Sequence, residues 1–315
     1  MKRNLCIVLS LVFALAGYTW GQDMAIASQE PEAGGDTPVI YTSFYPVKYF
    51  AERIGGDKVK VVCPVPATAD PAFWMPNAKT IQAFQRADVI IINGASFEKW
   101  IRKVTLPPSR IIDTAKPLAD ELIKLEKTVT HSHGPGGVHT HGGIDGHTWL
   151  DPVNAKTQAA QIHKAFSKRF PAHAELFDKN YDALARDLGA LDARLKGLRE
   201  RMSDQRLVCS HPAYNYIGRR YGWQLKNLHL DPETMPDEAT FAEIKVFLEK
   251  KPATYVLWES QPAKEIAAKM RKTLGLESLV FSPCEVLDAD QIEHGEDFLS
   301  VMNRNVDRLE KAFGK

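Results

Sequence analysis

Short apolar runs alternate with amphipathic stretches along most of this chain. The segment Asp88–Asn93 contains an unbroken apolar run, as expected for a strand of a parallel sheet that is covered on both faces. The segment Asn77–Arg86 instead brings Ile81 and Phe84 to one face of a helix and polar residues to the other. Strands that alternate with helices predict βαβ units, so the expected fold class is α/β.

The alternation occurs in two series that share a rhythm without clear sequence repetition. Strands are predicted at Val39–Ser43, Val59–Pro66, Asp88–Asn93 and Arg110–Asp113 in the first series, and at Arg206–Ser210, Leu225–Leu230, Tyr255–Trp258 and Ser278–Ser282 in the second. Helices are predicted at Val47–Ile54, Asn77–Arg86, Phe97–Val104 and Pro152–Arg169, and then at Tyr214–Tyr221, Glu238–Lys250, Ala263–Leu274 and Asp297–Phe313. Two such series predict two lobes, each with a small parallel sheet.

A long helix that Pro171 opens lies between the two series. Leucines recur along it at alternating spacings of four and three and form one apolar stripe, namely Leu184, Leu188, Leu191, Leu195 and Leu198. A coiled-coil dimer would use the same stripe. We favour a rigid helix within one molecule, lying across both lobes, because α/β patterns flank it on both sides.

These patterns divide the chain into an N-terminal lobe at 38–170 with a His-rich loop at 131–143, a linking helix at 171–204, and a C-terminal lobe at 205–315. Residues 1–27 have the basic start and short apolar run of a cleaved secretory signal, and 28–37 form a flexible leader. A retained anchor is the alternative. No cysteine directly follows the apolar run, so a lipid anchor (a lipobox) is not indicated. We therefore expect a periplasmic protein.

Charge and cysteine content narrow the function classes. The formal net charge is +1 and the isoelectric point is about 7.7, so there is no electrostatic case for nucleic acid or an anionic membrane as a partner. Cys6 belongs to the signal, which leaves Cys63, Cys209 and Cys284. An odd number of cysteines in an exported chain means at least one free thiol, an intermolecular bridge or a metal ligand.

Half of the ten histidines lie between residues 131 and 152, namely His131, His133, His139, His141 and His147. Neutral imidazole binds Zn(II) well, and short His-rich tracts are typical of metal binding. The first four lie in a Gly-rich setting, so we expect a mobile loop with secondary metal sites; a solvated loop without metal is the alternative. His147 is followed by apolar Trp149 and Leu150, so we expect it to be a preorganised ligand.

A second histidine, His211, directly follows a predicted strand of the other half. Ligands of open parallel sheets bind outside the carboxyl ends of the strands. On its own, His211 before Pro212 could be a turn residue. Together with His147, it predicts a metal site between the two lobes.

Five segments of this chain resemble the periplasmic metal receptors of zinc and manganese ABC importers, the ZnuA/TroA-like family of cluster A-I solute-binding proteins. They are TSFYPVKYFAERIGGDKV at 42–59, ADVIIINGASFEKWIRKV at 87–104, HTWLDP at 147–152, SHPAYNYIGRRYGW at 210–223 and DFLSVMNRNVDRL at 297–309. The resemblance implies two α/β lobes bridged by a long helix, a metal in the cleft, and handover to an ABC permease in the inner membrane. A His-rich loop is typical of the zinc-specific branch.

The resemblance matches the second and third metal ligands of the family to His147 and His211. It departs at two positions: Ala72 stands where the family usually has histidine, and the last acidic ligand aligns with Ser282 or Pro283. Four nearby residues could substitute, namely Asp70, Cys284, Glu285 and Glu259. A thiolate with imidazoles would suit Zn(II), although Cys284 could equally be buried and inert, or bridged to Cys63 or Cys209.

The sequence therefore favours a monomeric, non-enzymatic solute-binding protein for Zn(II), with Mn(II) ranked second. One alternative is a metal-dependent hydrolase with an open zinc site, although no HExxH, GxSxG or paired-carboxylate motif occurs. Another is a receptor of this fold whose ligand has changed to another metal or a metal chelate.

Overall fold

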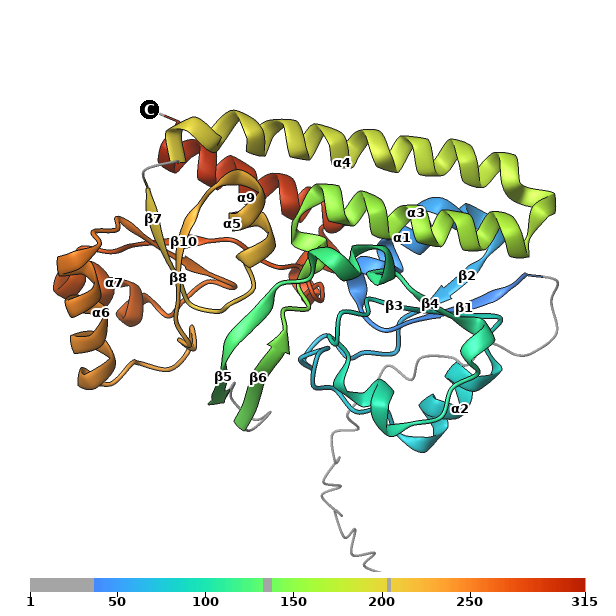
Figure 1. Ribbon diagram of the computed structural model, residues 1–315, viewed down its shortest axis with the longest axis horizontal. Helices are drawn as coiled ribbons and strands as arrows, with labels where there is room; N and C mark the ends of the chain where they lie inside the picture. Colours follow the sequence, from blue (N-terminus) through green and yellow to red (C-terminus); the bar gives the residue numbers. More distant parts are fainter. Residues whose placement is uncertain (1–36, 133–137, 203–204, 315) are drawn as a thin grey trace, which may run out of the picture. The chain divides into compact units, whose positions relative to one another are not determined.

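The computed structural model describes residues 37–132, 138–202 and 205–314, with side chains described outside 126–142. Two four-stranded parallel sheets form the framework, one in each half of the chain (Figure 1). The first sheet contains β1 (Val39–Thr42), β2 (Lys60–Val62), β3 (Val89–Ile92) and β4 (Ile111–Asp113). The second contains β7 (Arg206–Cys209), β8 (Gln224–Asn227), β9 (Tyr255–Trp258) and β10 (Glu277–Val280). The predicted α/β fold with two parallel sheets is confirmed.

The two sheets have the same topology. Their strand orders are β2-β1-β3-β4 and β8-β7-β9-β10. The direction in which successive strands are added reverses between β1 and β3 in the first sheet, and between β7 and β9 in the second. A ligand of a parallel sheet binds at the carboxyl ends of the strands beside such a reversal. The topology therefore selects the residues that follow these four strands as the first candidates for a site.

Several helices begin where the sequence supplies a capping residue. The side chain of Asn77 accepts the Thr80 amide, and the side chain of Asp151 accepts the Val153 amide. The described helices are α1 (Tyr45–Gly55), α2 (Ala78–Arg86), α3 (Pro152–Arg169), α4 (Ala174–Met202), α5 (Asn215–Tyr221), α6 (Glu238–Lys250), α7 (Lys264–Leu274), α8 (Ala289–Glu293) and α9 (Phe298–Phe313).

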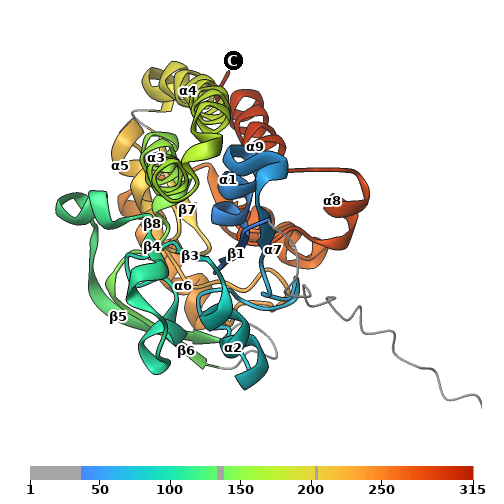
Figure 2. The same cartoon turned by 90° about the vertical axis from the view of Figure 1, so that its right-hand side faces the viewer.

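The long helix α4 packs along α1, α3 and α9, which Figures 1 and 2 show gathered on one side of the sheets. Its leucine stripe is buried, with no member more than 3% exposed, so the prediction of an intramolecular helix rather than a coiled-coil dimer is confirmed. The stripe belongs to one continuous core that also holds Ile40 of β1 and Leu207 of β7. The two sheets are therefore joined through a shared apolar interior.

The chain's last helix, α9, contacts the N-terminal half as well as its own. The Phe298 ring lies with its centroid 5.7 Å from that of Tyr49 and 5.2 Å from that of Phe50, both on α1. Aromatic pairs at such distances add to the stabilisation by burial.

The segment predicted as an irregular loop at 131–143 is instead an antiparallel hairpin in its described parts. Strand β5 (Lys124–Ser132) pairs with β6 (Val138–Ile144), and His131 lies opposite His139 in the register. The prediction was wrong because the β-branched residues between the histidines, Val138 and Thr140, favour strands in spite of the neighbouring glycines. His133 lies outside the described residues, as do the side chains of His131, His139 and His141.

The predicted helix Phe97–Val104 is also shorter than expected and is a 3₁₀ helix at Lys99–Lys103. The loop before it has left-handed backbone at Gly94, Ala95 and Ser96. Three successive residues of this kind delay the start of any helix.

We predict that Gly94→Ala destabilises the protein by about 2 kcal/mol or more. Gly94 has a φ of 81°, and an added Cβ would lie 1.9 Å from Asp113 Oδ1. Urea denaturation gives the free energy of unfolding. Gly189→Ala is the matched control, because no atom lies within 4 Å of a Cβ there, and alanine should stabilise α4 by roughly 0.5–1 kcal/mol. Equal denaturation midpoints for the two variants would contradict this account.

Candidate metal centre

His147 is held by a packed neighbourhood, as its sequence context predicts. It precedes a 3₁₀ helix at Thr148–Leu150, in which Trp149 is 1% exposed. The Trp149 ring lies 4.7 Å from the Phe44 ring and 5.0 Å from the Phe97 ring. Its Nε1–H donates a 2.8 Å hydrogen bond to the carbonyl of Pro283 in the other half of the chain. The backbone beside His147 therefore has one defined position.

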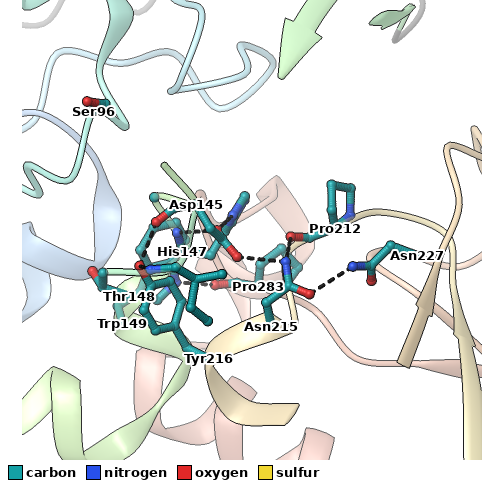
Figure 3. A network of polar contacts seen from close by, with 12 residues as sticks. Ser96, Asp145, His147, Thr148, Trp149, Pro212, Asn215, Tyr216, Asn227 and Pro283 are labelled. Carbon is teal, nitrogen blue, oxygen red and sulfur yellow. Dashed lines mark hydrogen bonds and ion pairs between the residues drawn. The ribbon is translucent and has the colours of Figure 1, made fainter. Parts of the chain in front are cut away.

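Asp145 sets the orientation of the His147 ring. One carboxylate oxygen, Oδ1, lies 2.8 Å from His147 Nδ1 and also accepts the His147 amide at 3.0 Å. The other oxygen accepts Asn215 Nδ2–H at 2.9 Å, and the Asp145 carbonyl accepts the Tyr216 hydroxyl at 2.8 Å (Figure 3). Asp145 therefore ties His147 to helix α5 of the second lobe. A carboxylate behind an imidazole is the usual support of a metal-binding histidine, since it leaves Nε2 for the ion.

A buried polar network supports the residues on either side of His147. Asn93, which follows β3, donates through Nδ2 to the Gly146 carbonyl at 2.9 Å. Its Oδ1 accepts the Thr148 hydroxyl at 3.2 Å and Gln158 Nε2–H at 2.9 Å. The Asn93 amide in turn donates to the buried Glu98 carboxylate at 2.6 Å. Because buried polar groups need such partners, the network fixes the loop that carries His147.

Glu98 also connects this network to the end of β1. Its carboxylate accepts the Ser43 hydroxyl at 2.5 Å and the Gly94 amide at 3.2 Å. Burial raises the pKa of Glu98 despite these donors. Ser43 and Asn93, which follow the strands beside the reversal of the first sheet, therefore support the loop that carries His147. Neither is a candidate metal ligand.

The corresponding strand ends of the second sheet supply candidate ligands directly. His211 lies just beyond β7, and Glu259 directly follows β9. The His211 ring centroid is 5.6 Å from that of His147, with the rings at 78° to each other. Each histidine is 7% exposed. The two imidazoles predicted to share an ion therefore lie side by side, one from each lobe.

Glu285 reaches the same place from the loop after β10. Its Oε1 lies 3.3 Å from His147 Nε2, and its backbone carbonyl accepts the Tyr45 amide at 3.3 Å. The preceding Cys284 has left-handed backbone, with a φ of 57°, which turns the chain at this point. Glu285 is thus held against the first lobe although it belongs to the second.

A cavity of about 700 Å³ opens on these residues. Its lining includes the predicted site residues Asp70, His211, Glu259, Cys284 and Glu285, and also Ala72. A much smaller pocket, which Ala72 also lines, is formed by His147, Phe97 and Pro212 among others. Within the described ranges, no three His, Cys, Asp or Glu side chains stand at distances that would hold a metal as they are. Binding an ion here therefore requires side chains to move.

The electrostatics of the centre favour a cation. Burial by itself would lower the pKa of His147, but Asp145 and Glu285 outweigh it and raise the pKa to about 10. Burial raises the pKa of Glu259 to about 8, and the charges of Glu285 and Asp70 contribute to the rise. At neutral pH the metal-free centre therefore holds protons that a metal ion can replace.

The cysteines have a different character. Cys63, Cys209 and Cys284 are free thiols, which excludes a disulfide among the three. Cys284 is 1% exposed, and burial raises the pKa of its thiol well above the usual range. A thiol that stays protonated is a weak metal ligand.

The sequence pattern did not identify Asp145 as part of the centre. Its signal is its position two residues before His147, with Gly146 between them. The backbone can then turn so that one carboxylate oxygen accepts both the amide and the ring N–H.

Two α/β lobes joined through a long helix, with imidazoles and carboxylates where the lobes meet, define the class of two-lobed solute-binding proteins. The chain belongs to the ZnuA family, described as "Zinc-uptake complex component A periplasmic", which matches residues 40–312. The family consists of uptake components rather than enzymes, so the hydrolase alternative loses its basis. Across the described residues we find no helix with the length and apolar character needed to cross a membrane.

Relatives and solved structures agree with this assignment. The chain is 30% identical over 296 residues to the zinc-binding lipoprotein AdcA of Streptococcus pneumoniae, covering 92% of this chain but only 58% of that relative. It is 24% identical to the high-affinity zinc uptake system protein ZnuA of Bacillus subtilis, covering 89% of each chain. The Zn(II)-bound ZnuA-like domain of S. pneumoniae AdcA superposes with a TM-score of 0.74 at 26% identity, covering 89% of this chain and 100% of that domain.

We predict that the metal-free protein loses stability as pH rises. The folded state holds the protons of Glu259 and His147 more tightly than the unfolded chain does. The stabilisation by the Glu259 proton is complete below its ordinary pKa of 4.5 and is lost as pH rises through about 8. The stabilisation by the His147 proton is complete below its ordinary pKa of 6.5 and is lost as pH rises through about 10. The free energy of unfolding, measured with urea from about pH 6 to about pH 10, should fall.

Asp145→Asn provides the control for this pH profile. It removes the charge that raises the pKa of His147, so the decline above neutral pH should become shallower. A wild-type profile that is flat over this range would show that neither group holds its proton as described.

Proposed function

We propose that this protein is an extracytoplasmic receptor that captures Zn(II) between its lobes through His147, His211 and Glu285. The observation that carries the proposal is the position of His147 Nε2: with Nδ1 engaged by Asp145, it faces Glu285 and lies beside His211. Imidazole nitrogens and carboxylate oxygens are ordinary zinc ligands, and tetrahedral coordination needs four donors. Glu259 and Asp70 line the same cavity and are the candidates for a fourth protein ligand.

The donor set favours Zn(II) over Mn(II). Two imidazoles suit zinc, whereas manganese prefers an oxygen-rich set, and zinc lies above manganese in intrinsic affinity. The acidic surroundings attract either ion, so the selectivity rests on the histidines. Cys284 is a weaker candidate ligand than the carboxylates because its buried thiol keeps its proton.

The receptor would deliver its metal as a monomer to an ABC permease in the inner membrane. The family description, a periplasmic component of a zinc-uptake complex, supports this partner. The chain spans little more than half of AdcA, so the whole activity of that relative is not transferred to it. A cleaved signal at 1–27 and a leader at 28–37 would place the two lobes in the periplasm; both segments lie outside the described residues.

The hairpin β5–β6 is proposed to bind additional zinc weakly through His131, His133, His139 and His141. The pairing of His131 with His139 brings two of these positions together in the backbone register. A hairpin at the side of the site could raise the local zinc concentration without contributing to the tight centre.

We predict that His147→Ala, His211→Ala and Glu285→Gln each remove tight zinc binding. The loss of zinc affinity should exceed the roughly 10–100-fold that removal of a supporting partner causes. Asp145→Asn removes only such a supporting partner, so its loss of zinc affinity should fall within that range. Competition with a fluorescent zinc chelator measures all four affinities.

Two variants serve as controls for these measurements. His163→Ala removes a histidine that pairs with Asp178 and stacks on Tyr181, away from the centre, and should bind zinc like the wild type. Cys284→Ser should also retain the affinity. Tight binding that survives both His147→Ala and His211→Ala would contradict the proposed site.

We predict that changing His131, His133, His139 and His141 together to Asn removes the weak sites and leaves one tight site. Asparagine preserves the polarity of the hairpin but removes the imidazole donors. Zinc stoichiometry by elemental analysis at high and low zinc concentration distinguishes the two classes of site. Loss of the tight site in this variant would show that the hairpin belongs to the centre.

A further inference from the structure

The cavity beside the candidate centre is much larger than a metal ion needs. Its volume of about 700 Å³ lies in the range of about 300–1,000 Å³ typical of pockets for organic ligands. Its lining includes Asp70 and Ala72 of the first lobe and Glu259 and Glu285 of the second. A bare ion would occupy only the space next to its ligands and leave most of this volume to water.

The protein also supplies few donors on one side of the centre. Ala72 borders both the large cavity and the pocket of His147, and its methyl group offers no donor atom. His147, His211 and Glu285 would provide three of the four donors that Zn(II) prefers. Because Ala72 supplies no donor, an external ligand in the cavity competes only with Asp70 and Glu259 for the fourth position.

The lining of the cavity also carries positive charge. Arg304 and Arg308 lie four residues apart on α9 and both line the cavity. Like charges at this spacing repel each other. Arg304 is paired with Glu296, whereas Arg308 donates to the Val280 carbonyl at 3.3 Å. Burial and the charge of Arg304 lower the pKa of Arg308. A carboxylate beside Arg308 would offset both effects by stabilising the charged guanidinium, with which it would form a charge-assisted hydrogen bond.

The remaining charges of the cavity restrict the kind of anion. Its lining contains more carboxylates than guanidiniums, namely Asp70, Glu233, Glu259, Glu285, Asp288 and Asp290. A chelator with several carboxylates would be repelled by them. A zwitterionic chelator brings one carboxylate together with amine or imidazole nitrogens, and its net charge is near zero.

From these features we propose that the cavity receives Zn(II) as a complex with an amino-acid chelator of the histidine type. The nitrogen donors of the chelator complete the coordination on the side of Ala72, and its carboxylate binds the guanidinium of Arg308. This inference rests on the proposed zinc centre and names the chemical form in which that centre takes its metal.

Equilibrium dialysis with radiolabelled L-histidine tests the proposal on the full mature protein. With one equivalent of zinc, the wild type should retain about one histidine per protein, and without zinc it should retain none. Labelled citrate should not be retained. Tight zinc binding without histidine retention would overturn the proposal and leave the zinc receptor intact. Absence of zinc binding, with or without histidine, would contradict the proposed function itself.

Variants of Ala72 and Arg308, which both line the cavity, make the test specific. Ala72→His supplies an imidazole from the protein, so it should keep zinc and lose histidine retention. Arg308→Gln should weaken histidine retention about 10-fold while Arg308→Lys largely preserves it. Arg271→Gln, which removes an exposed arginine paired with Glu277, is the matched control and should behave like the wild type. Unchanged histidine retention in both Ala72→His and Arg308→Gln would place the amino acid elsewhere and overturn the proposal.

Discussion

The candidate centre depends on one buried interaction, the hydrogen bond between Asp145 and the Nδ1 atom of His147. It fixes the ring, raises the pKa of His147, and directs Nε2 toward Glu285. The same aspartate accepts hydrogen bonds from Asn215 and Tyr216 of the second lobe. One carboxylate therefore orients a ligand of the first lobe and attaches it to the lobe that carries the others.

The two sheets share a topology, but the residues that follow their strands have different roles. In the first sheet, Ser43 and Asn93 follow the strands beside the reversal and enter a buried network around Glu98. In the second, His211 and Glu259 occupy the corresponding positions and face the cavity. The first lobe thus holds His147 in place, and the second lobe provides the other candidate donors. The protons held by His147 and Glu259 limit the repulsion among the carboxylates until a cation arrives.

Much of the fold could be predicted from the sequence because its signals are local. The apolar run at β3 and the amphipathic pattern of α2 each depend on neighbouring residues only. The leucine stripe of α4 predicted a buried face, and it is buried. His147 and His211 could be proposed as a pair because each is next to a packed segment at a strand or helix boundary. The hairpin β5–β6 could not be predicted because its pairing joins residues on either side of a glycine-rich segment, whose local composition favours a loop.

The sequence by itself thus determined the α/β class, the long helix and the two histidines, all of which follow from the spacing of apolar and polar residues. Only the tertiary structure decided which carboxylates surround them. Asp145, Glu259 and Glu285 lie far apart in the chain, and their roles depend on distances set by the packing of the two lobes. The same holds for Arg308, which lines the cavity because α9 packs beside β10. Such positions cannot be read from local patterns, since a carboxylate or a guanidinium on a surface and one in a cleft have the same sequence signature.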